Sequence, residues 1–581
     1  MSAPGKFVVA ARIAMKELLS ITTLGAGLVL FLARLSTLGG IHTLLYDSDS
    51  LTMPLFARAL HAPEGMGWIS GPFLGLFPEL PTYLLADLLT PTTKSALVVC
   101  GFLNVLLLYL AMRLLASMCG MAFTRARTAA TVGTLLITLG MAAETFGSSD
   151  WRLGWMLFSS TYYVGISTLG VVTLALVTRI IRGHRSPTGI VTLPPVYLSG
   201  TLGLISLLAT VSNPMFSVIV SVPCCAAIVV FRFARRCSRL VAMVAIGTLG
   251  TGTLLGYLLQ PKLHMVSGSV NGYIHGDRIW RTARMVGAMI ASLVADPFGA
   301  FELAMLVGSV LFALIQTVQI LLQRKPASQA VRPYSRDSSF ESPSMVRSEV
   351  GSSINANFAF DEAINVEVGR TEGNPSPRMF VSVFVASWVV LAPFALIITG
   401  PGVTRYFGTF AVFPVCVLVA NVPLIARRYL GARRKASVAG VALLSGAAVG
   451  FFPSAQAAIA VSPPAEIACV SATVPHGSSG VAEFWTARPI DLFNTAGLRV
   501  LQSTPTLGIS AWISNPAEFK HRDLTFVLTS WDKSGYTQLD ASSVAPLGNP
   551  SRVTKCGRLD VYEYFPGTPA HSNLNSRFVY P

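Results

Sequence analysis

The stretch "LLSITTLGAGLVLFLARLS", residues 18–36, is apolar over nearly the length that an α-helix needs to cross a lipid bilayer. Beyond it, residues 44–60 read "LLYDSDSLTMPLFARAL" and place Asp47 and Asp49 where a membrane helix has just ended. No small-residue cleavage pattern follows the apolar run, so we expect an uncleaved anchor rather than a signal peptide.

The rest of the chain has the same apolar character. Of 581 residues, 52% are hydrophobic and 12% are charged, whereas a soluble domain carries roughly 25% charged residues. The sequence therefore predicts a polytopic α-helical membrane protein with about 11 transmembrane helices. The candidate spans are 18–36, 95–113, 129–146, 155–178, 189–210, 214–232, 240–259, 300–322, 380–399, 406–426 and 437–455.

The formal net charge of +16 reflects the orientation of these spans rather than a nucleic-acid partner, because the basic residues lie between apolar runs. The N-terminus and the four short loops on its side carry 18 Lys and Arg, and the opposite loops carry eight. The positive-inside rule then predicts a cytoplasmic N-terminus and an extracytoplasmic, or periplasmic, C-terminus. We expect a multi-pass protein of the plasma (inner) membrane. The opposite loops are 37–94, 147–154, 211–213, 260–299 and 400–405.

Two segments depart from the membrane pattern. Residues 323–378 are rich in Ser, Pro and Arg, and we expect a disordered cytoplasmic insert there. From residue 456 to 581 the chain is more polar, and runs such as "LTFVLTSW" and "RLDVYEYF" indicate strands. We therefore expect a transmembrane domain over 1–455 and a small extracytoplasmic α/β or β-rich domain over 456–581.

The C-terminal segment contains two of the eight cysteines, Cys469 and Cys556. Two cysteines in an oxidising compartment favour a disulfide, and the alternative is a pair of buried thiols.

The acidic pair lies in the first predicted outer loop, 37–94, which we expect to form a shelf along the membrane with Trp68, Phe77 and Tyr83 at the headgroups. The arrangement resembles the GT-C class of membrane glycosyltransferases, which includes the protein mannosyltransferases, the lipid A aminoarabinose transferases and bacterial relatives. The matching segments are "DSDSLTMP", "FPELPTY", "RYFGTFAVFP" and "GVAEFWTARPIDLF". Glu79 stands where this family is expected to have Asp.

The resemblance implies a GT-C-like bundle and an inverting transfer of a sugar, such as arabinofuranose or mannose, from a polyprenyl phosphate. The acceptor would be an envelope glycan, a lipid or a protein at the outer face of the membrane. Asp49 is the expected general base, with Asp47 as the fallback or as its supporting partner. Arg405, beside Tyr406, is expected to hold the leaving phosphate; the alternative for Arg405 is an anchor at a helix end.

Further site residues are expected in two other outer segments. Arg278 and Arg281 lie on one face of a predicted interfacial helix and would bind either the donor phosphate or lipid headgroups. Trp68, Glu79 and Tyr83 are expected to line the acceptor pocket. A divalent metal is possible, but no residue pattern supports one, and no other cofactor is indicated.

Two alternative functions remain at this stage. An O-antigen ligase or polymerase is also a multispan protein, but a large central outer loop is expected in it. A transporter is expected to place ionisable residues within its spans or to show inverted repeats, and neither is clear in the sequence.

Overall fold

The structure is a computed structural model, in which most of the chain is helical. It describes residues 3–37, 40–63, 67–71, 73–144, 155–161, 164–182, 196–263, 265, 276–295, 297–322, 377–399, 404–429, 434–520, 522–530 and 539–580. The predicted insert 323–378 lies almost entirely outside these residues.

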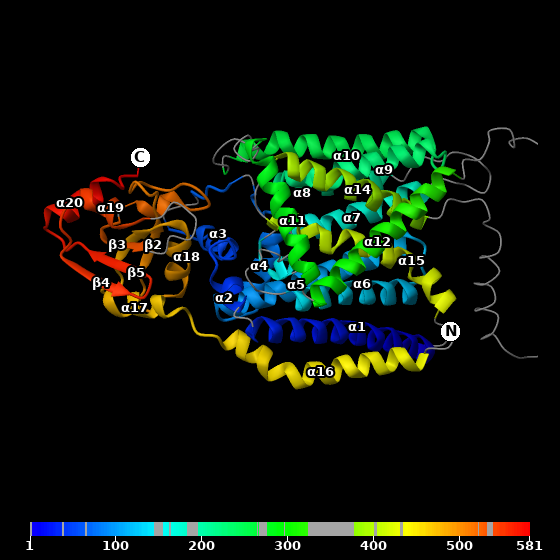
Figure 1. Ribbon diagram of the computed structural model, residues 1–581, viewed down its shortest axis with the longest axis horizontal. Coiled ribbons are helices and arrows are strands. Elements are labelled where there is room, and N and C mark those ends of the chain that lie inside the picture. The colour runs from blue at the N-terminus through cyan, green and yellow to red at the C-terminus, as the bar shows by residue number, and fades with distance from the viewer. Residues whose placement is uncertain are drawn as a thin grey trace, which may run out of the picture.

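A bundle of helices forms the first part of the chain (Figure 1). Its α-helices are α1 (Ala3–Thr37), α2 (Gly40–Tyr46), α3 (Thr52–Ala59), α4 (Glu79–Leu88), α5 (Thr93–Met118), α6 (Phe123–Ala143), α7 (Val164–Arg182), α8 (Val196–Ser212), α9 (Val222–Phe233), α10 (Arg239–Leu259), α11 (Ile279–Ala295), α12 (Pro297–Leu322), α14 (Pro377–Thr399), α15 (Phe413–Tyr429) and α16 (Arg434–Ala460). Short helical turns are η1 (Trp155–Phe158), η2 (Ser217–Ser221), η3 (Gln260–Leu263), η5 (Gly276–Arg278) and η8 (Thr404–Ala411).

The described residues contain eight helices that are long and apolar enough to cross a membrane, so the protein is membrane-embedded. They are Ile13–Ser36, Thr93–Met118, Phe123–Ala143, Val164–Arg182, Arg239–Leu263, Gly299–Leu322, Pro377–Ile398 and Ala442–Thr473. Three shorter apolar helices, Val196–Ser212, Ser217–Phe233 and Phe407–Asn421, fall in the other predicted spans. The predicted span 155–178 starts late, because polar residues 159–161 separate η1 from α7.

Close helix packing accounts for some of the glycines in the spans. A Cβ on Gly252 of α10 would lie 2.4 Å from the carbonyl oxygen of Gly203 in α8. The backbones of α8 and α10 therefore touch, as small residues allow in membrane bundles. At the side of the bundle, α16 lies along α1, so the first and the last long helix are neighbours (Figure 1).

A small mixed sheet forms the centre of the C-terminal domain, in the order β2-β1-β3-β5-β4. Strand β1 pairs in parallel with β2 and β3, whereas β5 is antiparallel to β3 and β4. Its strands are β1 (Ser479–Ala482), β2 (Arg499–Gln502), β3 (Leu524–Ser530), β4 (Arg552–Cys556) and β5 (Leu559–Glu563). The accompanying helices are α17 (Ala465–Thr473), α18 (Phe484–Phe493), α19 (Ala541–Val544) and α20 (Pro569–Ser576), with short turns η9 (Pro516–Phe519) and η10 (Ala545–Leu547).

Both faces of this sheet are covered. In β3, Phe526 and Leu528 belong to one apolar core and Val527 belongs to the other, as the two-residue period of a strand requires. Of the two architectures that the sequence left open, the sheet with helices on its faces is the one observed.

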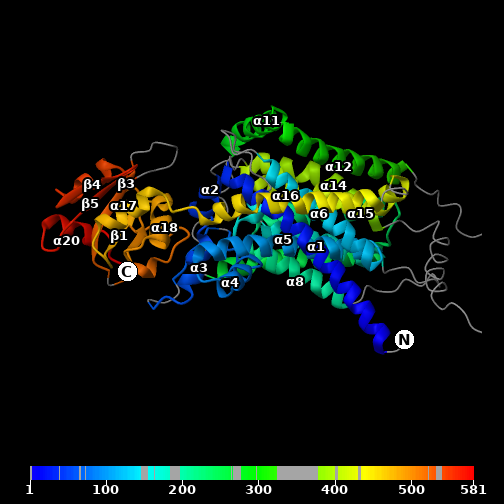
Figure 2. The same ribbon diagram turned by 90° about the horizontal axis from the view of Figure 1, so that it is seen from below.

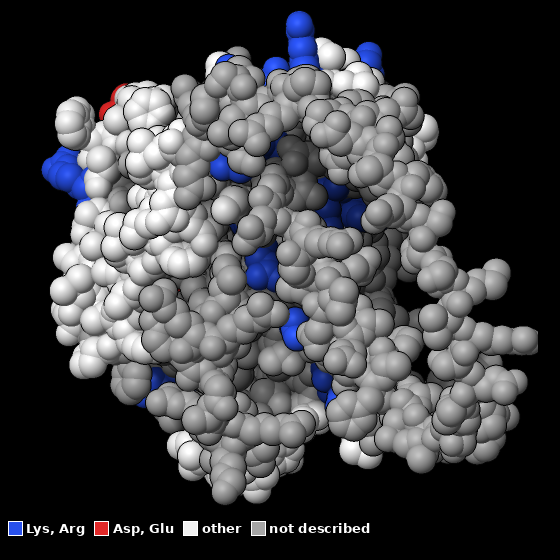
Figure 3. Space-filling view, turned by 90° about the vertical axis from the view of Figure 1, so that its right-hand side faces the viewer, with Lys and Arg blue, Asp and Glu red and all other residues white. Residues whose placement is uncertain are grey.

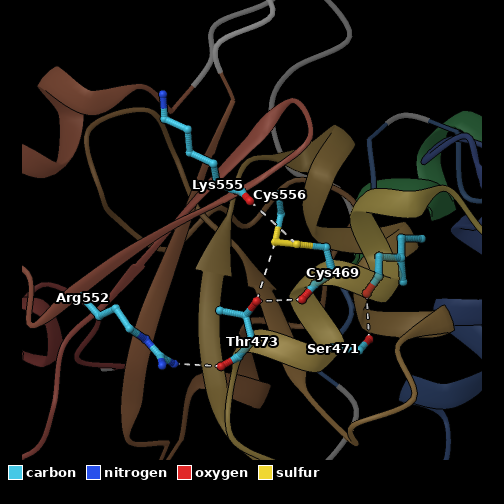
Figure 4. Close-up of a disulfide and its surroundings, with 7 residues drawn as sticks. Cys469, Ser471, Thr473, Arg552, Lys555 and Cys556 are labelled. Carbon is cyan, nitrogen blue, oxygen red and sulfur yellow. Dashed lines mark hydrogen bonds between the residues drawn. A yellow bond between two sulfur atoms is a disulfide. The ribbon is translucent and has the colours of Figure 1, made fainter.

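A disulfide joins Cys469 in α17 to Cys556 at the end of β4, with a Cα–Cα distance of 5.5 Å (Figure 4). Beside it, Arg552 of β4 donates a hydrogen bond to the carbonyl oxygen of Thr473 at 2.9 Å. The bridge therefore fixes the first helix of the domain to an edge strand of the sheet.

The C-terminal domain lies at one end of the bundle, next to α2 and α3, and the N-terminal end of α1 lies at the other end (Figure 1). Residues 461–464 connect α16 to the domain. The carbonyl oxygen of Val461 accepts hydrogen bonds from Tyr46 at 3.2 Å and from Lys94. The loop 37–94, called the first loop from here on, thus binds the first residue of the segment that connects α16 to the C-terminal domain.

Candidate functional site

The acidic pair forms a tight turn between α2 and α3. The backbone N–H of Asp49 donates to the Asp47 carboxylate at 3.0 Å, and that of Thr52 donates to the Asp49 carbonyl at 3.2 Å. Such a side-chain-to-backbone bond two residues on is the usual way in which Asp stabilises a turn. Asp49 is 9% exposed and Asp47 is half-buried, so the two carboxylates differ in their access to solvent.

The bundle holds this turn from one side by means of residues 159–161, which precede α7. Thr161 donates its hydroxyl to the carbonyl oxygen of Asp49 at 3.2 Å, and Ser160 donates to that of Ser50 at 2.8 Å. The polar residues that delay α7 therefore fix the main chain of the acidic turn.

The C-terminal domain holds the same turn from the other side by means of α18, the "EFWTARPIDLF" segment. The Ser48 hydroxyl donates to the carbonyl oxygens of Phe484 and Trp485, each at 3.0 Å. Arg488 of the same helix donates to the Ser48 carbonyl at 2.7 Å and to the Thr52 hydroxyl at 3.0 Å. Two segments that the sequence analysis matched separately thus meet across more than 400 residues.

Further contacts extend this interface along the first loop. Arg58 of α3 pairs with Asp491 of α18 and, at 3.5 Å, with Glu518. Ile69 forms an antiparallel bridge with Ser514, with N–H to carbonyl distances of 2.8 and 2.9 Å. The first loop is therefore part of the interdomain interface as well as of the bundle.

Glu79 is buried at the start of α4, with 2% of its surface exposed. Its carboxylate accepts the backbone N–H of Gly165, at the start of α7, at 3.0 Å. A Cβ on Gly165 would lie 2.4 Å from this carboxylate oxygen, so the approach requires glycine. Burial raises the pKa of Glu79 to about 7, although the backbone N–H groups of Glu79 and Gly165 act in the opposite direction.

The expectation of an aromatic belt at the headgroups is wrong for Trp68 and Tyr83, since both are buried inside the protein. Trp68 stacks on Phe56 with ring centroids 5.0 Å apart, beneath the C-terminal domain. The Tyr83 hydroxyl lies 3.4 Å from Asp87, and burial raises the pKa of Tyr83. Protein atoms of the domain interface and of the bundle, rather than lipid, cover these rings.

A small cavity of about 40 Å³ opens at the interface between α3, α18 and the loop around Trp68. A water needs roughly 10–15 Å³ of such space, and ligand pockets are usually of several hundred Å³. The cavity therefore suits a few waters and is too small for a sugar. Trp68 and Gln502, which line it, each have a buried polar atom without a hydrogen-bond partner in the part of the chain that is described.

The expected phosphate-binding residues are not all brought to this site. Arg405 and Tyr406 lie in η8, whose backbone packs against η1 and α7, but their side chains are outside the described residues. Arg278 and Arg281 are exposed, and Arg278 lies 3.7 Å from Asp277. Arg278 ends η5 and Arg281 lies in the following helix α11, which is on the opposite side of the bundle from α3 and α4 (Figure 2).

Sequence reasoning missed three features: Arg488 and residues 159–161 at the acidic turn, and Glu302 in α12. Arg488 lies within the matched segment "GVAEFWTARPIDLF", but nothing in that segment marks it as a site residue, and residues 159–161 follow no recognisable motif. The role of both depends on the chain that packs around them. Glu302 carried a readable signal, an acid within the apolar span Gly299–Leu322. It is 2% exposed, close to Gly140 of α6, and one carboxylate oxygen has no hydrogen-bond partner among the described residues. Within those residues, no group of three or more His, Cys, Asp and Glu could hold a metal ion.

Comparison of the chain with protein-family models and with curated proteins finds no match.

Proposed function

We propose that this protein is a membrane glycosyltransferase of GT-C type that transfers a sugar from a polyprenyl phosphate to an acceptor hydroxyl. The supporting observation is the acidic turn. Asp49 is almost buried at the end of the bundle, and both the bundle and the C-terminal domain bind the backbone around it. A carboxylate fixed in this way suits proton transfer in a confined site.

In the proposed reaction, the acceptor hydroxyl attacks the anomeric carbon while the bond from that carbon to the lipid phosphate breaks. Asp49 takes the hydroxyl proton, and the leaving phosphate carries away the electron pair of the broken bond. Asp47 supports the turn by accepting the Asp49 N–H. Arg405 is the proposed partner of the phosphate, because η8 packs against η1 and α7 near the acidic turn.

The proposed orientation places the C-terminal domain outside the cytoplasm, with eleven spans made of the eight long helices and the three shorter ones. The Lys and Arg side chains visible at the opposite end of the bundle (Figure 3) and the disulfide in the domain support it. A topology reporter fused to the C-terminal end of the chain should be active only outside the cytoplasm. Cytoplasmic activity would reverse the orientation.

A transporter is the second candidate, and Glu302 favours it because a buried acid within a span is a common element of ion pathways. The two candidates differ in which carboxylate is indispensable. In a glycosyltransferase of the proposed kind, Asp49 is essential and Glu302 is not.

The deciding experiment uses purified protein and a polyprenyl-phosphate sugar. Asp49→Asn keeps the size of the side chain but cannot take the proton, so turnover should fall at least ~10²-fold while donor binding persists. Arg405→Ala should weaken donor binding as well, because the phosphate is charged before the reaction begins. Glu302→Gln serves as the control and should retain transfer; near-normal turnover of Asp49→Asn would refute the proposal.

A further inference from the structure

We propose that Arg488 of the C-terminal domain is a positioning residue for Asp49, so that the acidic turn is competent only while the domain is docked. This inference rests on the proposed function, since it assigns the proton transfer to Asp49. It adds a residue and a domain that take part in the reaction without touching the sugar.

Arg488 binds both ends of the turn with a single nitrogen atom. Its Nη1 donates to the carbonyl oxygen of Ser48, just before Asp49, and to the hydroxyl of Thr52, three residues after it. The other terminal nitrogen donates to the carbonyl oxygen of Ile513 in the C-terminal domain. One guanidinium therefore spans from its own domain to the two ends of the acidic turn.

A contact within the C-terminal domain also holds the side chain of Arg488 in position. Its guanidinium carbon lies 4.2 Å from the centroid of the Phe484 ring, and the residue is 3% exposed. A planar cation stacked on an aromatic ring has few alternative positions. Hydrogen bonds offset the cost of burying its charge.

Side chains of the bundle hold the acidic turn from the side opposite Arg488. Three consecutive carbonyl oxygens accept side-chain hydrogen bonds: that of Ser48 from Arg488, that of Asp49 from Thr161 and that of Ser50 from Ser160. The peptide units on both sides of the Asp49 Cα are thus fixed, and they set the direction of its side chain. A catalytic group must be held within roughly 0.5 Å of its working position.

Lysine is not expected to replace Arg488 fully. Its ammonium group is a single point of charge, whereas the guanidinium presents separate nitrogen atoms to the turn and to Ile513. A lysine at this position should hold the turn or its own domain, but not both with good geometry. Arg488→Lys keeps the positive charge but changes the hydrogen-bond geometry, so it tests whether the position of the donors matters rather than the charge.

The test compares Arg488→Ala and Arg488→Lys with Arg552→Ala in the full-length protein. Arg552 pairs with Glu563 inside the C-terminal domain and does not contact the turn in the interactions described. Turnover is measured per bound polyprenyl-phosphate sugar, so that a loss of folded protein does not count as a loss of rate. Hydrogen–deuterium exchange of the peptide covering residues 44–60 reports on the turn independently of activity.

For Arg488→Ala, we expect turnover per bound donor to fall about 10²-fold, the typical effect of misplacing a reacting group by ~1 Å, with donor KM nearly unchanged. Exchange of the Leu51 and Thr52 amides should become about tenfold faster, as loss of one or two hydrogen bonds predicts. Arg488→Lys should recover part of the rate at an unchanged Tm, and Arg552→Ala should retain the wild-type rate.

Two failures are distinguishable. Unchanged exchange over 44–60 in Arg488→Ala, or an equal loss of turnover in Arg552→Ala, would overturn the role of Arg488. If Arg488→Ala does not fold, Arg488→Lys decides the matter, and a wild-type rate in a variant with faster exchange rejects positioning. Absence of sugar transfer by the wild-type protein would instead overturn the proposed function, while the exchange experiment still shows whether Arg488 holds the turn.

Discussion

Two of the attachments between the first loop and the rest of the protein use opposite chemistry. At the acidic turn, backbone carbonyls of the loop accept hydrogen bonds from side chains of the C-terminal domain and the bundle. At Glu79, a side chain of the loop accepts a hydrogen bond from the backbone of α7. The first attachment depends on the position of a separate domain, and the second depends on the protonation of a buried acid.

This difference separates the roles that we propose for Asp49 and Glu79, two acids of one loop. The main chain of the turn accepts hydrogen bonds from the neutral hydroxyls of Ser160 and Thr161 and from Arg488, a cation that is charged at every physiological pH. Glu79, with a pKa raised to about 7 by burial, changes its charge near neutrality. The contacts at the acidic turn are therefore expected to respond to loss of the C-terminal domain's structure, and the contact at Glu79 is expected to respond to pH.

The largest expected effect comes from removing the disulfide. Changing both Cys469 and Cys556 to Ser releases a constraint across a sequence separation of 87, worth about 4 kcal/mol in the chain-entropy model. The C-terminal domain should exchange amide hydrogens faster, and so should residues 44–60, which it holds. Amides of α4 and α7 near Glu79 should be unaffected; equal loosening of α4 would mean that the two attachments are not independent.

The second effect concerns Glu79 and pH. Because its folded-state pKa, about 7, lies above the ordinary value of 4.5, the folded state holds the proton more tightly. The stability of the wild-type protein should therefore fall as the pH rises from about 4.5 to about 7, by about 3 kcal/mol. Glu79→Gln removes this dependence, so its Tm should exceed that of the wild type at pH 8 and match it at pH 4.5. Parallel Tm curves for the two proteins would contradict the buried-acid account.

A third, smaller effect is expected at the glycine opposite Glu79. Gly165→Ala places a Cβ too close to the carboxylate and should cost about 1–3 kcal/mol. Shortening the acid with Glu79→Asp should relieve part of that loss in the double variant, as measured by a double-mutant cycle of Tm values. Gly200→Ala is the matched control, since a Cβ there meets nothing within 4 Å; equal losses at both glycines would exclude a specific clash.

The smallest effect is expected on the bundle side of the turn. Thr161→Val removes the hydroxyl that donates to the Asp49 carbonyl and should cost about 1 kcal/mol. Thr201→Val, whose hydroxyl bonds only within its own exposed helix turn in the contacts described, should change stability by less than about 0.5 kcal/mol. The relevant measurement is faster amide exchange at Thr52 in the first variant and not in the second.

Sequence reasoning located the membrane helices and the C-terminal sheet because apolar runs and strand patterns are local properties. It also singled out "DSDSLTMP" and "GVAEFWTARPIDLF", but not their contact, since nothing in either segment encodes a partner more than 400 residues away. The arginines show the same limit: Arg278 and Arg281 have a regular spacing and are exposed, whereas Arg488 has no special spacing and is buried against the turn. The exposed fraction of a side chain and its hydrogen-bond partners distinguish Arg488 from Arg278 and Arg281, and both follow only from packing.

The four residues that join α16 to the C-terminal domain have a consequence for how tightly the domain must bind. Fully extended, they span at most about 14 Å, so the domain cannot move far from the first loop even when its contacts are broken. A short tether of this kind gives an effective concentration on the order of 1 mM. An interface with an intrinsic Kd of only ~10 µM would then be closed about 99% of the time. A weak contact is thus enough to keep the domain docked on the acidic turn.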